Sequence, residues 1–250
     1  MAEVTDSMRT VVITGGGAGL GRAVARKFIA AGDRVMLLGR TAGKLQAAAV
    51  ALGERAGAVP CDVSSPDSVR AAFDRITELA GGLDVLINNA ALFEPFMLED
   101  ASDQQILGAV GTNLIGPMLC ARAAIPLMGA GAHIINITSE SVDADLPHLS
   151  VYQSTKAGLE PLSRSLLREL EPRGIRVTNV HAGAMFEAGK TWDVDPEARK
   201  AFVLAAQGRG FDFVNRPLSQ FDSVAQLIHT LTDLPADLGV TSISLEARHS

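Results

Sequence analysis

The chain has 250 residues, 47% of them hydrophobic, and a formal net charge of −6. This length and apolar content exclude global disorder, and we expect a single domain with one core over residues 1–250. The acidic balance, without a basic block, argues against nucleic acid or an anionic membrane surface as a partner. The cysteines, Cys61 and Cys120, lack the spacing of a metal site, so we expect no metal ion and no disulfide framework.

Residues 1–9 are polar and acidic, which is not the pattern of a signal peptide. No uninterrupted apolar run reaches the roughly 18 residues that a membrane-spanning helix needs. We therefore expect a cytoplasmic protein.

Short β-branched runs alternate with longer Ala- and Leu-rich stretches along the chain. Strands that are apolar on both faces and separated by helices are typical of a parallel sheet covered on both sides. With right-handed crossovers, the pattern predicts a doubly wound Rossmann-type α/β fold of about seven strands. The expected strands are 10–14, 35–38, 58–61, 85–87, 134–137, 175–177 and 240–245. The expected helices are 19–31, 44–52, 69–79, 103–128, 151–170, 196–206 and 224–231.

The first strand runs directly into a glycine-rich segment at residues 14–21. Its glycines fit the spacing T-G-x-x-x-G-x-G, and the helix that follows offers free N–H groups and the positive end of its dipole. A backbone of this kind can approach a pyrophosphate closely. We therefore expect a dinucleotide to contact Gly15, Gly17, Gly19, Leu20 and Gly21. The alternative is a glycine-rich turn that binds nothing.

The second strand lacks the acidic residue that binds a ribose 2′-hydroxyl in many dinucleotide sites, and Arg40 stands beside that position. A guanidinium suits a 2′-phosphate, so we expect NADP(H), with NAD(H) as the second choice. The alternative is a surface arginine that opens a loop. Asp62 and Val63 follow the third strand and are expected at the adenine, although Asp62 also suits a simple turn.

Tyr152 and Lys156 are four residues apart, so they share one face of the expected helix. A nearby ammonium stabilises a phenolate and lowers a tyrosine pKa from about 10, so Tyr152 can exchange a proton with a carbonyl or alcohol oxygen. Ser139, at the end of the fifth strand, can hydrogen-bond the same oxygen. The alternative for each residue alone is an ordinary helical pair or a cap.

Together these motifs resemble the short-chain dehydrogenase/reductase superfamily, in its NADP(H)-preferring branch, over residues 10–180. The resemblance is carried by the glycine segment, by Asn88-Asn89-Ala90, by Asn113, by Ser139 and by the Y-x-x-x-K motif from Tyr152 to Lys156. It implies Asn113, Ser139, Tyr152 and Lys156 as the catalytic set. It also implies that Asn89, Ala90, Tyr152, Lys156 and Gly183 contact the cofactor, with Lys156 on the nicotinamide ribose and a water held by Asn113.

The resemblance implies an oxidoreductase that interconverts a ketone and a secondary alcohol, with the hydride carried by NADP(H). Two alternatives stay open: a dinucleotide-binding regulator without turnover, and an isomerase or dehydratase that uses the same site. The chain departs from the family pattern at Ala91, Ala182 and Glu187, where glycine, proline and threonine are usual. These departures affect the nicotinamide end of the site.

Residues 183–217 form a long insertion after the sixth strand, rich in aromatic residues. We expect a mobile lid over an apolar substrate, with Ser139, Phe93, Met185 and Trp192 at the substrate; ordinary packing of the aromatics is the alternative. No cluster of arginines along the sequence marks a phosphate or carboxylate substrate.

The two longest helices carry large apolar sets and are expected to face the sheet and, as the family implies, to form the interface of a homodimer or homotetramer. Pro117 and Pro161 predict local kinks in them. The apolar sets are Ile106, Val110 and Leu114 in one helix and Leu159, Leu162 and Leu166 in the other.

Overall fold

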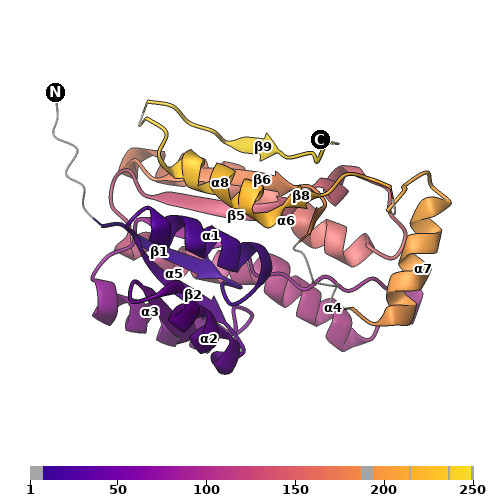
Figure 1. Ribbon diagram of the computed structural model, residues 1–250, viewed down its shortest axis with the longest axis horizontal. Coiled ribbons are helices and arrows are strands. Elements are labelled where there is room, and N and C mark those ends of the chain that lie inside the picture. The colour runs from indigo at the N-terminus through magenta and orange to yellow at the C-terminus, as the bar shows by residue number, and fades with distance from the viewer. Residues whose placement is uncertain (1–7, 187–193, 214, 236, 249–250) are drawn as a thin grey trace.

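The computed structural model describes residues 8–186, 194–213, 215–235 and 237–248. Seven parallel strands form its main sheet in the order β3-β2-β1-β4-β5-β6-β9 (Figure 1). The order reverses direction beside β1, as in a doubly wound sheet, so the expected α/β Rossmann-type fold is confirmed. The strands are β1 Thr10–Thr14, β2 Arg34–Gly39, β3 Ala56–Pro60, β4 Val85–Asn88, β5 His133–Ser139, β6 Arg176–Ala182 and β9 Ser242–Ser244.

Helices cover both faces of the sheet because alternate residues of each strand point to opposite sides. On one face, strand residues such as Ile13 and Ile135 pack against α1 (Gly19–Ala30), α2 (Ala42–Leu52) and α8 (Phe221–Thr232). On the other face, Val12 and Ile134 pack against α3 (Pro66–Ala80), α5 (Gly116–Ala124) and α6 (Ser150–Leu170). Both strand faces are apolar, as a doubly covered parallel sheet requires.

The helix expected over 103–128 is continuous in space but not uniform. It consists of α4 (Asp103–Val110), the π-helical turn η2 (Gly111–Ile115), α5 and the 3₁₀ turn η3 (Ile125–Leu127). Pro117 cannot donate a backbone hydrogen bond to residue 113, and its ring crowds that carbonyl, so the helix widens in the turn before the proline. The local irregularity beside Pro117 is therefore a π-helical turn at Gly111–Ile115, which contains Asn113.

The helical stretch Asp103–Leu127 is long and apolar enough to cross a membrane by length and composition, with a mean hydropathy of 1.3. We expected no such stretch because isolated polar residues interrupt every apolar run. Half of it is buried inside the protein, where Cys120 and Ala124 face the sheet. The core helix of a folded domain passes the same test, and burial against the sheet accounts for the apolar composition.

The segment after β6 differs most from expectation. β6 continues to Ala182, and a two-stranded parallel ribbon, β7 (Met185–Phe186) with β8 (Ser219–Gln220), was not predicted. The helix α7 (Pro196–Gln207) lies between these two strands in sequence and stands beyond the carboxyl ends of the main sheet (Figure 1). Short 3₁₀ turns complete the described chain: η1 Leu98–Asp100, η4 Glu140–Asp143 and η5 Glu171–Arg173.

Three buried asparagines stand at the same level on neighbouring strands. Asn88, Asn136 and Asn179 are register partners on β4, β5 and β6, and each is less than 5% exposed. Asn88 Nδ2 donates to Asn136 Oδ1 at 2.8 Å, and Asn136 Nδ2 donates to Ser163 Oγ of α6 at 2.7 Å. Ser163 Oγ lies 2.7 Å from Asn179 Oδ1 and 2.8 Å from Leu159 O. This polar network joins the three strands to α6.

The network predicts a large stability cost for Ser163→Ala. The substitution leaves Asn136 Nδ2 and Asn179 Oδ1 buried without the hydroxyl, and each unsatisfied group costs about 1–3 kcal/mol. We expect the free energy of unfolding in urea to fall by about 2–4 kcal/mol. The exposed Ser165 on the same helix is the matched control, and Ser165→Ala should change stability by less than about 0.5 kcal/mol. Equal losses for the two variants would contradict the role of the network.

Candidate active site

Three glycines of the loop, Gly15, Gly19 and Gly21, hold positions that a side chain would strain or crowd. Gly15 has a φ of +68° and Gly19 of +53°, in the left-handed region that favours glycine. A Cβ atom on Gly21 would lie 2.5 Å from Gly15 O. Gly17 is less constrained, because its Cβ would only reach ordinary contact with Leu45 at 3.4 Å. Leu20 is buried and anchors the start of α1 in the core.

The N-terminus of α1 has the free donors that an anion needs. Its N-cap residue, Ala18, makes no side-chain cap, and the first turn of this fully described helix has no acidic residue. The first N–H groups of the helix therefore point outward at the positive end of its dipole. The chemistry of this donor set fits the pyrophosphate of a dinucleotide.

A large cavity extends from the end of β2 to α7. Its volume is about 1310 Å³, and Arg40, Tyr152 and Phe202 all line it. Arg40 is exposed directly after β2, where a ribose carrying a 2′-phosphate would be expected. The same hollow is therefore lined by Arg40 at one side and by Tyr152 and Phe202 at the other.

Of four residues expected at the cofactor, three form hydrogen bonds within the protein and one is buried. Asp62 Oδ1 accepts from Ser64 N at 3.0 Å and from Ser64 Oγ at 2.7 Å, so it closes a turn. Asn89 Nδ2 donates to Thr14 O at 2.9 Å, and the Ala90 N–H donates to Thr14 Oγ1 at 3.0 Å. The side chain of Val63 is buried. Asn89 thus fixes the glycine loop through its side chain, and Val63 has only its backbone to offer a ligand.

Ser139 and Tyr152 lie close together at the carboxyl end of β5. Ser139 is the last residue of β5. Its Oγ lies 2.9 Å from Ser141 Oγ and accepts a hydrogen bond from Ser141 N at 3.2 Å. Tyr152 lies in the first turn of α6, with its hydroxyl close to that of Ser139. Burial raises the pKa of Tyr152, and the nearby Ser139 hydroxyl partly offsets that effect.

Lys156 lies one turn further along α6 and is almost completely buried, at 3% exposure. Its Nζ donates to Ile137 O of β5 at 2.7 Å. Burial lowers the pKa of Lys156 to about 8. In this state Lys156 is not a cause of the Tyr152 shift, so the expected lowering of the tyrosine pKa is not found in the protein alone. The ammonium points at a strand carbonyl because that carbonyl is its nearest acceptor.

Asn113 is fully buried in the π turn, and its side-chain amide forms hydrogen bonds within the protein. Asn113 Oδ1 accepts from Leu92 N at 2.7 Å, and its Nδ2 donates to Leu92 O at 2.9 Å and to Thr155 Oγ1 at 3.2 Å. It therefore joins the loop after β4 to α6. Pro117, four residues further on, has no N–H to donate to the Asn113 backbone carbonyl, where the expected water could bind.

The substrate side of the cavity is an aromatic cluster. The ring of Phe93 contacts Tyr152 edge-on at 5.0 Å and Phe202 at 6.1 Å, and Phe202 lies 5.2 Å from Phe213. Leu146, Leu149 and Ala206 pack behind them in a small third core. Phe93 and Met185, both expected at the substrate, line the cavity, whereas Trp192 lies outside the described residues.

Gly183 lies where the nicotinamide end is expected. A Cβ on Gly183 would approach Leu245 O to 2.4 Å and Glu140 Oε2 to 3.3 Å, so only glycine fits between β9 and η4. Ala182 is buried beside it and Ala91 lines the cavity, while Glu187 lies outside the described residues. The departures at Ala91 and Ala182 therefore add small apolar groups around the site.

Several charged and polar residues of the cavity were not foreseen from the sequence. Glu140 and Arg216 form an ion pair at 2.5 Å although they are 76 residues apart, and Arg199 of α7 lines the same cavity. Gln153 donates to the Ser141 and Ala144 carbonyls and holds η4 against α6. The sequence offers a signal only for Glu140, which follows Ser139 directly.

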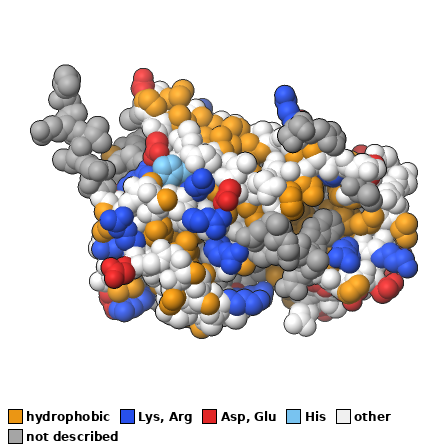
Figure 2. All heavy atoms as spheres, in the orientation of Figure 1, with side chains coloured by type: hydrophobic (Ala, Val, Ile, Leu, Met, Phe, Trp, Pro, Cys, Tyr) orange, Lys and Arg blue, Asp and Glu red, His pale blue; other side chains and the backbone are white. Residues whose placement is uncertain are grey.

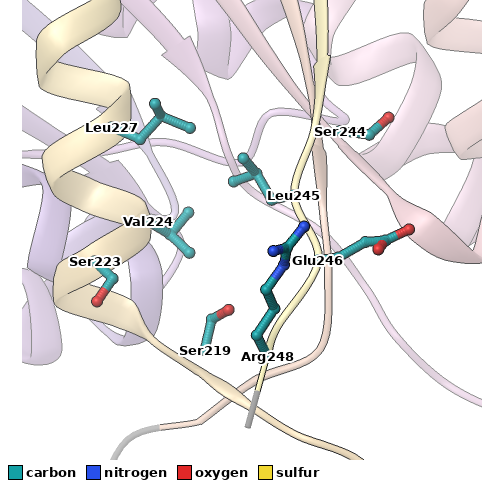
Figure 3. A pocket seen from close by; sticks show the side chains of 8 residues that line it. All are labelled: Ser219, Ser223, Val224, Leu227, Ser244, Leu245, Glu246 and Arg248. Atoms are coloured by element: carbon teal, nitrogen blue, oxygen red, sulfur yellow. The ribbon is translucent and has the colours of Figure 1, made fainter. Parts of the chain in front are cut away.

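A second hollow of about 390 Å³ lies between α8 and the C-terminal segment. Figure 3 shows Val224 and Leu227 of α8 pointing toward Leu245, with Ser223 and Arg248 at its border. It contains none of the four expected catalytic residues. Within the described part of the chain, no three His, Cys, Asp or Glu side chains are grouped so as to hold a metal ion.

The parallel sheet, the glycine loop and the Ser139–Tyr152–Lys156 arrangement are those of a dinucleotide-binding oxidoreductase. Residues 9–195 match the short chain dehydrogenase family. Carbonyl reductase family member 4 of Danio rerio is 35% identical over 177 residues, which cover 70% of this chain and 75% of that protein. An uncharacterised oxidoreductase of Methylorubrum extorquens is 33% identical over 186 residues, or 72% of this chain and 75% of that protein.

A solved short chain dehydrogenase of Burkholderia cenocepacia, in complex with NADP, superposes with a TM-score of 0.82 at 28% identity. The match covers 95% of this chain and 96% of that one. The chain therefore belongs to the short-chain dehydrogenase/reductase family: it is an NAD(P)-binding oxidoreductase with a Rossmann-type fold.

The buried Lys156 predicts a pH dependence of stability. Its pKa is about 8 in the folded protein and 10.5 when exposed, so between these values the unfolded chain binds more protons. The burial penalty is therefore complete below pH 8 and is relieved as pH rises toward 10.5, by up to about 1.4 kcal/mol per pH unit. We expect the stability of wild type relative to Lys156→Met to rise with pH over this window.

Urea unfolding at pH 7, 8, 9 and 10 measures this difference. Lys200→Met, which removes an exposed lysine of α7, is the control and should give a difference independent of pH. A flat difference for Lys156→Met would show that this ammonium is solvated in solution.

Proposed function

We propose that the protein is an NADP(H)-dependent oxidoreductase that interconverts a ketone and a secondary alcohol on a mostly apolar small molecule, with Tyr152 as the general acid and base. One observation carries the proposal: Tyr152 and Ser139 line the same cavity, at the point where it meets an aromatic cluster. The cavity offers an arginine at one end and aromatic rings at the other.

The protein's own groups account for proton transfer and orientation. A substrate oxygen placed between Ser139 and Tyr152 receives a hydrogen bond from each hydroxyl, and in the reductive direction the phenol proton moves to that oxygen. Charge that develops on Tyr152 in the buried site is costly, so the Lys156 ammonium is the group placed to stabilise it. When bound, the nicotinamide cofactor supplies or accepts the hydride. The aromatic cluster excludes water and positions the apolar body of the substrate.

Replacement of the phenol tests the assignment of Tyr152. Tyr152→Phe should lower turnover of ketone substrates at least about 10²-fold, because the general acid is lost. NADPH binding should remain nearly unchanged, since the hydroxyl acts on the substrate oxygen. Steady-state rates and a binding titration measure the two quantities, with Phe93→Leu as a variant that should alter KM more than kcat. A Tyr152→Phe enzyme with most of its wild-type rate would refute the proposed mechanism.

The preference for NADP(H) is supported by Arg40 on the cavity wall and by the NADP bound in the Burkholderia relative. A guanidinium forms charge-assisted hydrogen bonds with a 2′-phosphate, worth about 1.5–3 kcal/mol in total.

Arg40→Ala should therefore weaken NADPH binding about ten- to a hundredfold and leave NADH binding almost unchanged. Paired titrations with the two cofactors measure the effect. Equal losses for both cofactors, or tighter binding of NADH to the wild type, would contradict the role of Arg40.

Two other functions use the same fold. A dinucleotide-binding regulator would bind NADPH without consuming it, and an isomerase or dehydratase would convert substrate without net consumption. A screen of ketones and alcohols that follows the absorbance of reduced nicotinamide separates both from the proposed reaction. The Ser139–Tyr152–Lys156 arrangement, with Ser139 and Tyr152 on the cavity wall and Lys156 buried behind them, supports the oxidoreductase.

We further propose that residues 183–217 act as the substrate lid and that the protein works as a cytoplasmic homo-oligomer, a dimer or tetramer. Leu107, Ile115 and Met118 support an oligomer, because they are 70%, 42% and 40% exposed at helical spacing on α4–α5. Leu159 and Leu166 are buried against the sheet instead, and Leu162 is half-buried. The acidic balance of the chain supports the further proposal that nucleic acid and membranes are not its partners, and the face in Figure 2 carries basic, acidic and apolar side chains together.

A further inference from the structure

We propose that Glu140 determines the charge preference of the substrate site: by pairing with Arg216 it makes the site accept uncharged ketones and discriminate against carboxylates. The inference rests on the proposed function and adds to it a substrate class and the residue pair that selects it. Arg216 is then a group that can bind a carboxylate, and in the wild type the carboxylate it binds is that of Glu140.

The ion pair stands beside the reacting groups. Glu140 directly follows Ser139 and begins η4, and its Oε1 lies 2.5 Å from Arg216 Nη2. Both side chains are partly buried, with 31% and 25% exposure, and both line the cavity that Tyr152 lines. At such a distance in a partly desolvated site the pair is charge-assisted and strongly oriented.

Arg216 also lies at the far end of the aromatic cluster. Its guanidinium carbon is 5.8 Å from the centre of the Phe213 ring, and Phe213 contacts Phe202, which in turn contacts Phe93 beside Tyr152. A row of rings therefore runs from the general acid to the guanidinium. A substrate with its ketone at Tyr152 and an apolar body along these rings extends toward Arg216.

The neighbouring charges leave Glu140 as the group that controls Arg216. Asp212 accepts from Asn215 N at 3.0 Å and from Asn215 Nδ2 at 2.7 Å, so its carboxylate has partners of its own. Asp143 also lines the cavity, but it is exposed at the end of η4. An anionic substrate that reaches Arg216 must either displace Glu140 or lie beside its paired carboxylate, and both are unfavourable.

Glu140→Gln removes the charge while keeping the shape of the side chain, and Asp143→Asn removes the same charge three residues away. The probes are 4-acetylbenzoate and its methyl ester, which carry the same aromatic ketone with and without a carboxylate at the far end of the ring. For each variant, kcat/KM for the acid is divided by kcat/KM for the ester, so that intrinsic reactivity cancels between variants.

We expect Glu140→Gln to raise this ratio about tenfold or more, and Asp143→Asn to leave it within about twofold. Glu140→Asp, which keeps the charge, should resemble the wild type. Addition of Arg216→Gln to Glu140→Gln should return the ratio to the wild-type value, because the guanidinium is the group that binds the carboxylate. An unchanged ratio in Glu140→Gln, or a gain that survives Arg216→Gln, would overturn the inference.

Calorimetric titration of 4-acetylbenzoate into the NADP⁺-loaded protein keeps the inference testable without turnover. If no variant reduces either probe, the proposed function fails for this ketone class, and the binding constants still decide. Glu140→Gln should bind 4-acetylbenzoate about tenfold more tightly than wild type and Asp143→Asn should not. Equal affinity of all variants would refute the role of Glu140 and leave the proposed function to the ester kinetics.

Discussion

The arrangement of the site depends on one constraint, the satisfaction of polar groups buried where α6 packs on the sheet. Asn88, Asn136 and Asn179 place three amides inside a region that is otherwise apolar, and Ser163 supplies the hydroxyl that joins them to the helix. Such a network is stable only in one register, because a shift of a strand or of the helix would leave several buried groups unsatisfied. The same register sets Ser139 on β5 against Tyr152 on α6.

A hydrogen bond from a lysine side chain joins α6 to the sheet at a second point. Lys156 is buried and donates to Ile137 O, two residues before Ser139 on the same strand. Burial favours the neutral amine and lowers the pKa of Lys156, so a charged ligand bound beside it can change its protonation. Burial likewise favours the neutral phenol of Tyr152. The polypeptide alone thus provides a proton donor in place, and the proposed chemistry has the bound nicotinamide and substrate complete the electrostatics.

The lining residues at the two ends of the cavity come from different parts of the fold. At one end the lining residues Arg40, Ala91 and Leu92 follow the strands β2 and β4, so the main sheet places them. The other end is lined by residues of α7 and of the segment before β8, and the aromatic rings there pack in a small cluster of their own. In the proposed reaction, substrate selection therefore depends on residues that the sheet does not place, such as Phe202 and Arg216. This separation lets one scaffold serve many substrates.

The sequence by itself determined most of the sheet, the glycine loop and the Ser139, Tyr152 and Lys156 set, because each depends on local spacing: apolar periodicity, positive-φ glycines, or two residues on one helical turn. It did not determine the π turn around Asn113, the β7–β8 ribbon, the occupied side chains of Asn89 and Asn113, or the Glu140–Arg216 pair. These depend on contacts between residues far apart in the chain, and on desolvation, which raises the pKa of Tyr152 and lowers that of Lys156. Spacing alone carries no information on burial, so only the tertiary structure decided how the chemical groups of the site are charged and paired.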